Sequence, residues 1–205
     1  IRVGSLKGPT SMGLVSLMNT DTPANSYEFT MATAADELAA SIVSEKLDIA
    51  LVPANLASVL YQKTNGGVSV IDINTLGVLY VVSSDSSIQT MEDLKGKTVY
   101  LTGKGTTPDY VARYLLAENG LSEEDVILEY KSEAAEVAAI LKEKEGAVGL
   151  LPQPFVTVAC AQNENLNIVL DLNEEWNKVQ GESGSQLVTG VTVSYTHLRA
   201  HETGA

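Results

Sequence analysis

Two short glycine-containing segments have the composition of loops that bind small ligands through their backbone. The first runs from Lys7 to Gly13 and reads Lys-Gly-Pro-Thr-Ser-Met-Gly, and the second runs from Thr102 to Pro108 and reads Thr-Gly-Lys-Gly-Thr-Thr-Pro. Each separates a strand-like run from a helix-like run. Free N–H groups at the start of a helix attract anions and other hydrogen-bond acceptors. The segments therefore predict binding of a small acceptor-rich ligand, with an ordinary strand-to-helix turn as the alternative for each.

Neither segment has the pattern of a nucleotide-binding loop. A P-loop needs four residues between its glycines and then Gly-Lys-Ser/Thr, and a dinucleotide loop needs Gly-x-Gly-x-x-Gly. Both patterns are missing from the two segments. In the second segment, Thr107 is predicted to be a helix N-cap and Pro108 the first helical residue.

Two carboxamides follow apolar, strand-like runs at matching places. Asn55 belongs to Pro-Ala-Asn at 53–55, and Gln153 belongs to Pro-Gln-Pro-Phe at 152–155. A carboxamide can both donate and accept a hydrogen bond, which suits a polar ligand. The alternatives are that Asn55 caps the helix that follows it and that Gln153 fills a turn.

Groups suited to acid–base or nucleophilic catalysis are scarce. Both histidines, His197 and His201, lie close to the C-terminus, and the one cysteine, Cys160, lies in an apolar stretch. A lone cysteine in such a place is usually a small buried apolar residue, and no Cys and His spacing fits a zinc site. We expect no catalytic residue, no metal site and no cofactor, and therefore a protein that is not an enzyme.

Strand-like and helix-like runs alternate along the chain and must position these loops. This order is typical of a parallel sheet covered by helices. Thr33 and Asp36 are expected to form a capping box at the start of the second helix. The first set of runs comprises strands at 1–6, 27–31 and 48–52 with helices at 11–18, from 34 and at 55–61, and the second comprises strands at 98–102, 126–130 and 147–151 with helices at 108–118 and 133–144.

The two sets of runs match each other at a nearly constant offset. Val3 matches Val99, Thr10 matches Thr107 and Pro53 matches Pro152, at offsets of 96, 97 and 99 residues. A constant offset predicts two lobes of one topology, with coincidence between generic α/β segments as the alternative. The apolar run at 71–84 is expected to form a crossover or hinge. The expected organisation is lobe I at 1–83, lobe II at 84–165, an incomplete return to lobe I at 166–193 and a non-native tail at 194–205.

The tail at 194–205 breaks the pattern of the body. It resembles translated sequencing-adapter read-through at the end of a truncated reading frame, and we expect it to take no part in the fold. Ile1 already begins a strand-like run, so we expect that the chain was cut or processed just before it. A chain truncated at its C-terminal side should expose apolar sheet surface and aggregate readily.

Composition and charge exclude two classes of protein. The chain has 13 basic and 26 acidic residues and a formal net charge of −13. Such a chain has no long-range field that attracts a nucleic-acid backbone. With 44% hydrophobic and 19% charged residues it is globular, and its longest apolar runs are too short to cross a bilayer.

Three stretches carry a resemblance to a known family. They are Leu-Lys-Gly-Lys-Thr-Val at 94–99, the segment at 103–114 that follows it, and Asp-Ile-Ala-Leu-Val-Pro-Ala-Asn at 48–55. Together they resemble the substrate-binding proteins of ABC importers, most closely the nitrate, sulfonate, taurine and thiamine-precursor type. The resemblance extends over the body of the chain to about residue 193.

The resemblance implies a fold, a function and a location. The fold would be α/β, of the type II periplasmic-binding-protein kind, with two βαβαβ lobes, a hinge and an interlobe ligand cleft. The function would be that of an extracytoplasmic, monomeric solute-binding component, in the periplasm or on the cell surface as a lipoprotein. It would deliver a small polar organic molecule or oxyanion to a membrane permease, and indirectly serve a cytoplasmic ATPase.

The resemblance also implies where the ligand contacts fall, without identifying the ligand. By position, the ligand-binding residues would be Gly8, Pro9, Thr10, Ser11, Met12, Pro53, Ala54, Asn55, Thr75, Gly103, Lys104, Gly105, Thr106, Thr107, Gln153 and Pro154.

Two other classes of protein use the same fold and stay open at this point. One is a biosynthetic enzyme, although the pyrimidine-forming branch of the family is marked by a cysteine-rich motif and an essential histidine that this body lacks. The other is the ligand-sensing domain of a regulator.

Overall fold

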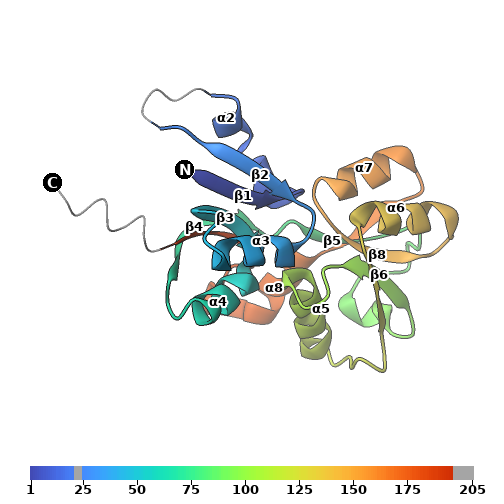
Figure 1. Cartoon of the computed structure of the whole chain (residues 1–205). Coiled ribbons are helices and arrows are strands. Elements are labelled where there is room, and N and C mark those ends of the chain that lie inside the picture. The colour runs from blue at the N-terminus through green and yellow to red at the C-terminus, as the bar shows by residue number, and fades with distance from the viewer. Residues whose placement is uncertain (21–24, 196–205) are drawn as a thin grey trace. The chain divides into compact units, whose positions relative to one another are not determined.

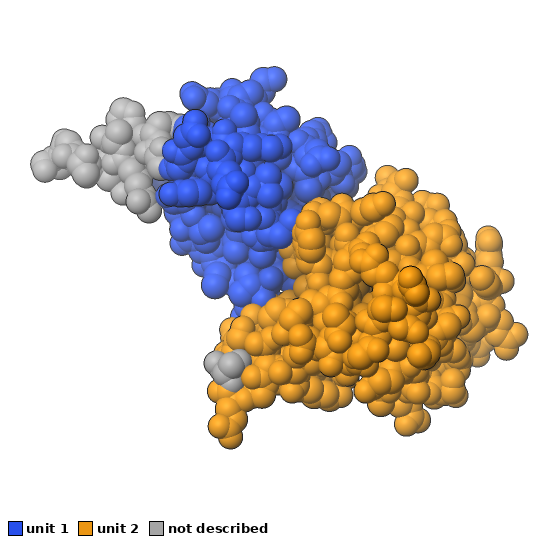
Figure 2. Space-filling view, turned by 90° about the horizontal axis from the view of Figure 1, so that it is seen from below, with its two compact units in different colours: residues 1–76, 188–205 blue, residues 77–187 orange. Residues whose placement is uncertain are grey.

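The computed structural model describes residues 1–20 and 25–195 (Figure 1). The chain divides into two compact units, which are coloured separately in Figure 2. Of the described residues, unit 1 contains 1–20, 25–76 and 188–195, and unit 2 contains 77–187. Each unit is built on one five-stranded sheet.

Unit 1 has a mixed sheet in the order β2-β1-β3-β10-β4. Strand β1 pairs in parallel with β2 and β3, and β10 enters antiparallel between β3 and β4. Leu38, Ile42 and Leu60 of the helices form one buried cluster with Val52 and Val191 of the strands, because an apolar stripe on each helix faces the sheet. The elements are β1 (Arg2–Leu6), α1 (Pro9–Met12), α2 (Val15–Met18), β2 (Glu28–Ala32), α3 (Ala35–Val43), β3 (Ile49–Pro53), α4 (Ala54–Lys63), β4 (Val68–Leu76) and β10 (Val188–Tyr195).

Unit 2 has the order β7-β6-β8-β5-β9 and helices on both faces of its sheet. Successive strand residues point to opposite faces. Accordingly, Leu101 of β6 lies in a core cluster with Leu115 of α5, whereas its neighbour Tyr100 lies in another with Leu141 of α6. The elements are β5 (Leu79–Ser83), η1 (Met91–Leu94), β6 (Thr98–Thr102), α5 (Thr107–Glu118), β7 (Ile127–Lys131), α6 (Ala134–Glu143), β8 (Val148–Pro152), α7 (Phe155–Gln162), β9 (Asn167–Asp171), α8 (Leu172–Gln180) and η2 (Gly181–Ser183).

The two sheets have the same topology. In each, a first strand pairs in parallel with two neighbours, and the fourth strand in the order is antiparallel to both strands beside it. Strands β2, β1, β3, β10 and β4 correspond to β7, β6, β8, β5 and β9. The predicted α/β fold with two βαβαβ lobes of one topology is confirmed.

The division between the units differs from the expected one at 83 and 165. The chain leaves unit 1 after Leu76 and returns after Leu187. Strand β5 belongs to unit 2 because Tyr80 pairs with Leu151 of β8 and with Asp171 of β9. Strand β9 was expected to return to lobe I, yet its partner is β5, and among the described strands it is β10 that makes the return.

Two local expectations are also corrected. The helix expected at 11–18 is two short helices, α1 and α2, separated by Gly13 and Leu14. The N-cap of α3 is Ala34, whose side chain makes no capping hydrogen bond, so Thr33 and Asp36 do not form a capping box. The capping pattern is therefore one residue out of register with the observed start of the helix.

The C-terminal strand extends beyond the predicted start of the tail. Ser194 and Tyr195 belong to β10, where Ser194 pairs with Ile49 and Tyr195 with Val68. The remainder of the predicted tail, 196–205, with both histidines, lies outside the described residues. Within residues 1–20 and 25–195, no helix has the length and hydropathy needed to cross a bilayer.

The Leu-Lys-Gly-Lys motif stabilises the turn that leads into β6 through two ion pairs and a backbone hydrogen bond. Lys97 Nζ lies 2.8 Å from Asp85 Oδ2, and Lys95 Nζ lies 3.1 Å from Asp125 Oδ1. Gly96 has a φ of 76°, which favours glycine, and its N–H donates to the Asp125 carbonyl at 2.7 Å. Both lysines of the motif therefore have structural partners within unit 2.

From the carboxylates of Asp85 and Asp125, we expect the protein to lose stability in acid. The hydrogen bond from Lys97 lowers the pKa of Asp85 to about 2, and hydrogen bonds from Ser122 and Lys95 lower the pKa of Asp125 to about 2. The unfolded chain binds these protons near pH 3.9, so this stabilisation is present at neutral pH and is lost between about pH 5 and pH 2. In urea titrations over that window, Asp85→Asn and Asp125→Asn should lose less stability with falling pH than the wild type.

The control for this experiment is Glu164→Gln, which removes an exposed carboxylate of unit 2 that forms no ion pair among the described residues. It should reproduce the wild-type dependence on pH. Parallel curves for the two aspartate variants and the wild type would contradict the assignment.

Strand β4 forms an exposed apolar edge of the unit 1 sheet. Val70, Ile71 and Ile73 are each at least half exposed. Because Val70 and Ile71 are successive, they point to opposite faces, and both faces of the strand are open there. An exposed apolar edge strand can pair with another chain.

We therefore expect that the double substitution Ile71→Lys and Ile73→Lys slows concentration-dependent aggregation, measured by light scattering, with little change in the thermal midpoint. A matched control places two lysines at exposed positions on the other sheet, Ile127→Lys and Ile168→Lys. Equal protection by both double variants would show that added charge, and not the β4 edge, controls aggregation.

Candidate functional site

The first predicted loop connects β1 to α1 in unit 1. The Lys7 N–H donates to the Ala32 carbonyl at 3.1 Å, and the Ser11 N–H donates to the Gly8 carbonyl at 3.2 Å. Gly8 is the N-cap of α1 and has a φ of 139°, a conformation that favours glycine, and Pro9 follows as the first helical residue. The loop is thus a tight turn that returns the chain onto the sheet.

Thr10 and Ser11 are buried at the start of α1. The Ser11 hydroxyl contacts the Ser5 hydroxyl at 2.6 Å and donates to the Leu6 carbonyl. Thr10 Oγ1 differs, because it is the one buried side-chain nitrogen or oxygen in the described part of the chain that has no hydrogen-bond partner. Leaving a buried hydroxyl unpaired costs about 1–3 kcal/mol.

Gly190 of β10 is the point at which three predicted site residues converge. It pairs with Pro53 of β3 and with Thr75 of β4, and the ladder is irregular on both sides of it. A methyl group at Gly190 would lie 2.9 Å from Thr10 Cγ2, 2.8 Å from Thr75 Oγ1 and 2.6 Å from Asn74 Oδ1. The structure thus brings Thr10, Pro53 and Thr75 together.

A polar network surrounds this point. The Thr75 hydroxyl donates to Asn74 Oδ1 at 2.6 Å, and Asn74 Nδ2 donates to the Thr192 hydroxyl at 3.0 Å. The buried Thr189 hydroxyl donates to the Thr75 carbonyl at 3.3 Å. Sequence analysis missed Gly190, although a glycine inside a strand pattern indicates a bulge or a close approach of backbone.

The other predicted residues of unit 1 lie less centrally. Met12 is 56% exposed. Helix α4 begins at Ala54 with Pro53 as its N-cap, so the alternative that Asn55 caps this helix is wrong. Asn55 lies half-buried in the first turn, next to Ala54.

The second predicted loop connects β6 to α5 in unit 2. Gly103 and Gly105 have φ values of 77° and 73°, which favour glycine. The Thr106 N–H and hydroxyl both donate to the Gly103 carbonyl, at 2.9 and 2.6 Å. Thr106 has an extended backbone and is the N-cap, so Thr107 is the first helical residue and Pro108 the second. The predicted cap was one residue too late because the motif has two adjacent threonines.

A buried carboxylate, that of Asp109, forms a hydrogen bond with the backbone of this loop. Asp109 is 4% exposed, and its Oδ2 accepts the Gly105 N–H at 2.7 Å. Its Oδ1 accepts from Arg113 Nε at 2.6 Å and from the Tyr130 hydroxyl at 2.7 Å. Burial raises the pKa of Asp109, but the hydrogen bonds from Gly105, Tyr130 and Arg113 outweigh burial and hold that pKa below its usual value.

The N–H groups of Gly105 and Thr106 therefore already have partners within unit 2. For these two groups, this corrects the expectation that the loop presents free backbone donors. Sequence analysis did not identify Asp109, although an acid three residues after an N-cap and four before an arginine is a recognisable signal.

Gln153 lies in the turn between β8 and α7. Its Oε1 accepts the Thr157 hydroxyl at 2.9 Å and the Thr157 N–H at 3.4 Å, and its own N–H donates to the Val78 carbonyl at 3.0 Å. The peptide bond to Pro154 is cis. The carboxamide oxygen of Gln153 thus stabilises the first turn of α7.

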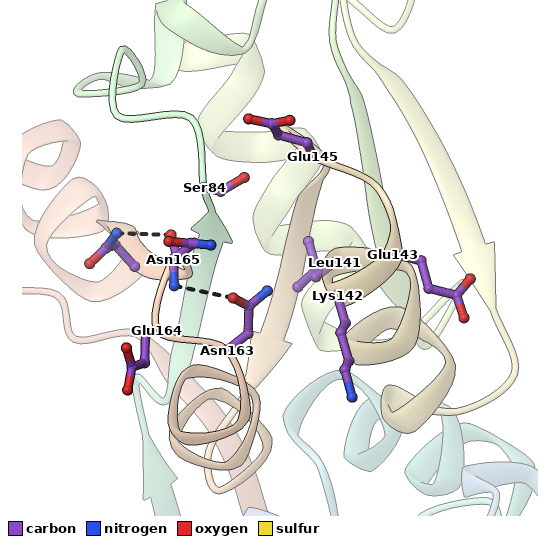
Figure 3. Close-up of a pocket in the computed structure, with 9 residues that line it drawn as sticks. Ser84, Leu141, Lys142, Glu143, Glu145, Asn163, Glu164 and Asn165 are labelled. Carbon is purple, nitrogen blue, oxygen red and sulfur yellow. Dashed lines mark hydrogen bonds between the residues drawn. The ribbon is translucent and has the colours of Figure 1, made fainter.

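A polar hollow of about 560 Å³ lies elsewhere in unit 2 (Figure 3). The Asn165 N–H donates to Asn163 Oδ1 at 3.1 Å, and Figure 3 shows Lys142 and Glu143 pointing away from these two asparagines. None of the predicted site residues lines the hollow, and its glutamates disfavour an anion. The lining residues are Ser84, Leu141, Lys142, Glu143, Glu145, Asn163, Glu164, Asn165 and Asn167.

A second hollow, of about 690 Å³, lies in unit 1 between α4 and β4. It is lined mostly by apolar and small side chains, and Ala54 is the one predicted site residue among them. Its lining residues are Ala54, Ala57, Ser58, Tyr61, Gln62, Val68, Ser69 and Val70.

The described residues contain no cluster of three or more histidine, cysteine, aspartate or glutamate side chains that could hold a metal ion. Burial raises the pKa of the half-buried Cys160 thiol, which leaves little of it as the nucleophilic thiolate at neutral pH.

Comparison with known families assigns the chain to a class. Residues 14–174 match the family of ABC transporter, phosphonate, periplasmic substrate-binding proteins. The match covers more than half of the chain, and the chain belongs to this family. The resemblance to ABC importer binding proteins is thereby confirmed. No curated protein matches the chain.

Solved structures of ABC binding proteins share the fold. An ABC transporter protein from Parabacteroides distasonis is 23% identical with a TM-score of 0.77, over 98% of this chain and 68% of its own. The periplasmic aliphatic sulphonate binding protein SsuA from Escherichia coli is 17% identical with a TM-score of 0.74, over 100% and 67%. The alkanesulfonate-binding protein SsuA from Xanthomonas axonopodis pv. citri, bound to MOPS, is 19% identical with a TM-score of 0.68, over 98% and 67%.

A substitution at Gly190 tests whether Thr10 and Thr75 meet at this residue in unit 1. Gly190→Ala should destabilise the protein by about 1–3 kcal/mol in urea unfolding, because the new methyl group overpacks against three side chains. Gly13→Ala is the matched control, since nothing lies within 4 Å of a methyl group there and its φ is −64°. Adding Thr10→Ser, which removes Cγ2, should recover part of the loss. Equal stability of the two alanine variants would contradict the convergence.

Proposed function

We propose that this chain captures a small molecule bearing a phosphonate, sulfonate or similar oxyanion group and delivers it to the membrane permease of an ABC importer. It acts outside the cytoplasm, as a monomer. The family to which the chain belongs and the sulfonate-binding names of structural relatives support this proposal.

The observation that carries the proposal is the unpaired hydroxyl of Thr10. A hydroxyl that is buried without a partner is destabilising unless another molecule pairs with it. Thr10 lies in the first turn of α1, directly after the loop that follows the parallel strand β1, beside Thr75 and Gly190. Ligands of open α/β sheets bind at the carboxyl ends of such strands. We assign Thr10 as a hydrogen-bond donor to a ligand oxygen.

The chemistry near Thr10 suits recognition without a buried counter-charge. Lys7 is exposed, and the groups that meet at Gly190 are the Thr75 hydroxyl, the Asn74 carboxamide oxygen and the Thr10 methyl group. Neutral donors can hold an anion when several of them converge on it. In unit 2, we assign Lys104 and Thr107 as further ligand-binding residues, at the loop that precedes α5. The other predicted positions stay proposals of the same kind.

The ligand class can be tested by thermal shift followed by calorimetric titration. The panel consists of methylphosphonate, ethanesulfonate, taurine, nitrate, inorganic phosphate and sulfate. At least one phosphonate or sulfonate should raise the thermal midpoint, because a ligand that binds only the folded state stabilises it. A thermal midpoint that no phosphonate or sulfonate of the panel raises would overturn the proposal.

Thr10 then separates ligand recognition from packing. Thr10→Val keeps the shape of the side chain and removes the hydroxyl, and should weaken binding of the best panel compound by roughly fivefold, the value of one neutral hydrogen bond. Thr10→Ser should bind within about twofold of the wild type. Thr64→Val makes the same change in unit 1 at the end of α4 and should leave affinity unchanged. Full affinity in Thr10→Val would remove Thr10 from the site.

A further inference from the structure

The loop between β6 and α5 is hydrogen-bonded to groups outside it. Its backbone needs two glycines with φ above 70°, and such turns fluctuate when nothing holds them. Thr106 closes the turn onto the Gly103 carbonyl. The tie that connects the turn to the body of unit 2 is the 2.7 Å hydrogen bond from the Gly105 N–H to Asp109.

Asp109 is in turn fixed by two side chains from different elements. Arg113 lies one helical turn further along α5, and Tyr130 lies on the neighbouring strand β7. Arg113 Nη2 also donates to the Tyr130 hydroxyl at 3.0 Å, which closes a triangle of three side chains. Arg113 Nη1 contacts Glu123 at the exposed end of the network. The carboxylate is therefore buried, charge-paired and held by three donors.

A second contact, between Lys104 and Tyr130, connects the same loop to the same network. Lys104 Nζ lies 5.4 Å from the centre of the Tyr130 ring, within the range of a cation–π contact. Tyr130 thus contacts the loop through Lys104 and supports it through Asp109. Both glycines are flanked by residues that this network holds.

We propose that Asp109, supported by Arg113 and Tyr130, is a positioning residue that holds the loop at 103–106 ready to bind ligand. The inference rests on the proposed function, because it takes this loop to be part of the ligand site. It assigns no ligand contact to Asp109 itself. A preformed loop avoids the entropic cost of ordering on binding, so loss of the tie lowers affinity even where the fold survives.

The first experiment needs no ligand. Amide hydrogen exchange of Gly105, followed by NMR, should be about tenfold faster in Asp109→Ala than in the wild type, because the amide loses its acceptor. Asp109→Asn keeps an oxygen for Gly105 but turns an NH2 group toward two donors, and should exchange at an intermediate rate. Glu175→Gln is the matched control, because Glu175 is an equally buried carboxylate of unit 2, paired with Lys178 on α8. It should leave Gly105 exchange unchanged.

The second experiment measures affinity for methylphosphonate and taurine by calorimetry. Asp109→Ala should weaken binding of whichever compound the wild type binds by about tenfold, with partial rescue in Asp109→Asn. Glu175→Gln should bind as the wild type does, even where its thermal midpoint falls as far as that of Asp109→Ala. Unchanged Gly105 exchange in Asp109→Ala, or tighter binding in Asp109→Asn, would overturn the inference. Absence of binding by the wild type, together with faster Gly105 exchange, would instead overturn the proposed function and leave the loop tie established.

Discussion

Unit 1 depends on the pairing of β10 with β3 and β4. Strand β10 is the only described segment that returns to unit 1 after the chain has traversed unit 2, and it occupies the place between two strands that would otherwise have no common neighbour. Long-range pairing of this kind carries a large loop-closure cost, which buried contacts such as those of Val191 and Val193 must offset. The same strand carries Gly190. The contact that completes the sheet is therefore also the contact that brings Thr10, Pro53 and Thr75 together.

The net charge of −13 has little bearing on the loops because their acids are either absent or paired. The loop of unit 1 from Lys7 to Gly13 contains no carboxylate at all. In unit 2 the nearest carboxylate, Asp109, is neutralised by Arg113 and fully engaged as an acceptor. Exposed acids instead gather around the hollow in unit 2, at Glu143, Glu145 and Glu164. An acidic protein can in this way keep a region that tolerates an anion.

Much of the fold could be predicted from the sequence because its strands are short apolar runs and its helices carry apolar stripes. The equivalence of the two lobes followed from matched positions such as Pro53 and Pro152. The neighbours of each strand could not be predicted, because β9 and β10 are both strand-like runs and only pairing decides that the first joins β5 and the second β3. The second loop was located correctly, whereas the first, predicted at 7–13, contains helix α1. The hydrogen bonds of both depend on single-residue register. That is why the N-cap moved to Thr106 and why the acceptor role of Asp109 was missed.

The two loops show how one topology supports different chemistry. Both follow the first strand of a parallel pair, both lead into a helix with a proline in its first turn, and both use glycines in conformations that other residues avoid. In unit 2 the polar groups of the turn have partners within the unit, through Thr106, Asp109 and Tyr130. In unit 1 the corresponding helix is only four residues long and has no acid in its first turn, and the Thr10 hydroxyl has no partner. Under the proposed function, a lobe whose loop is already saturated would gain affinity from rigidity, whereas a lobe with an unpaired donor would gain it from the new hydrogen bond. Equivalent backbone positions in the two units would then contribute to binding by different physical means.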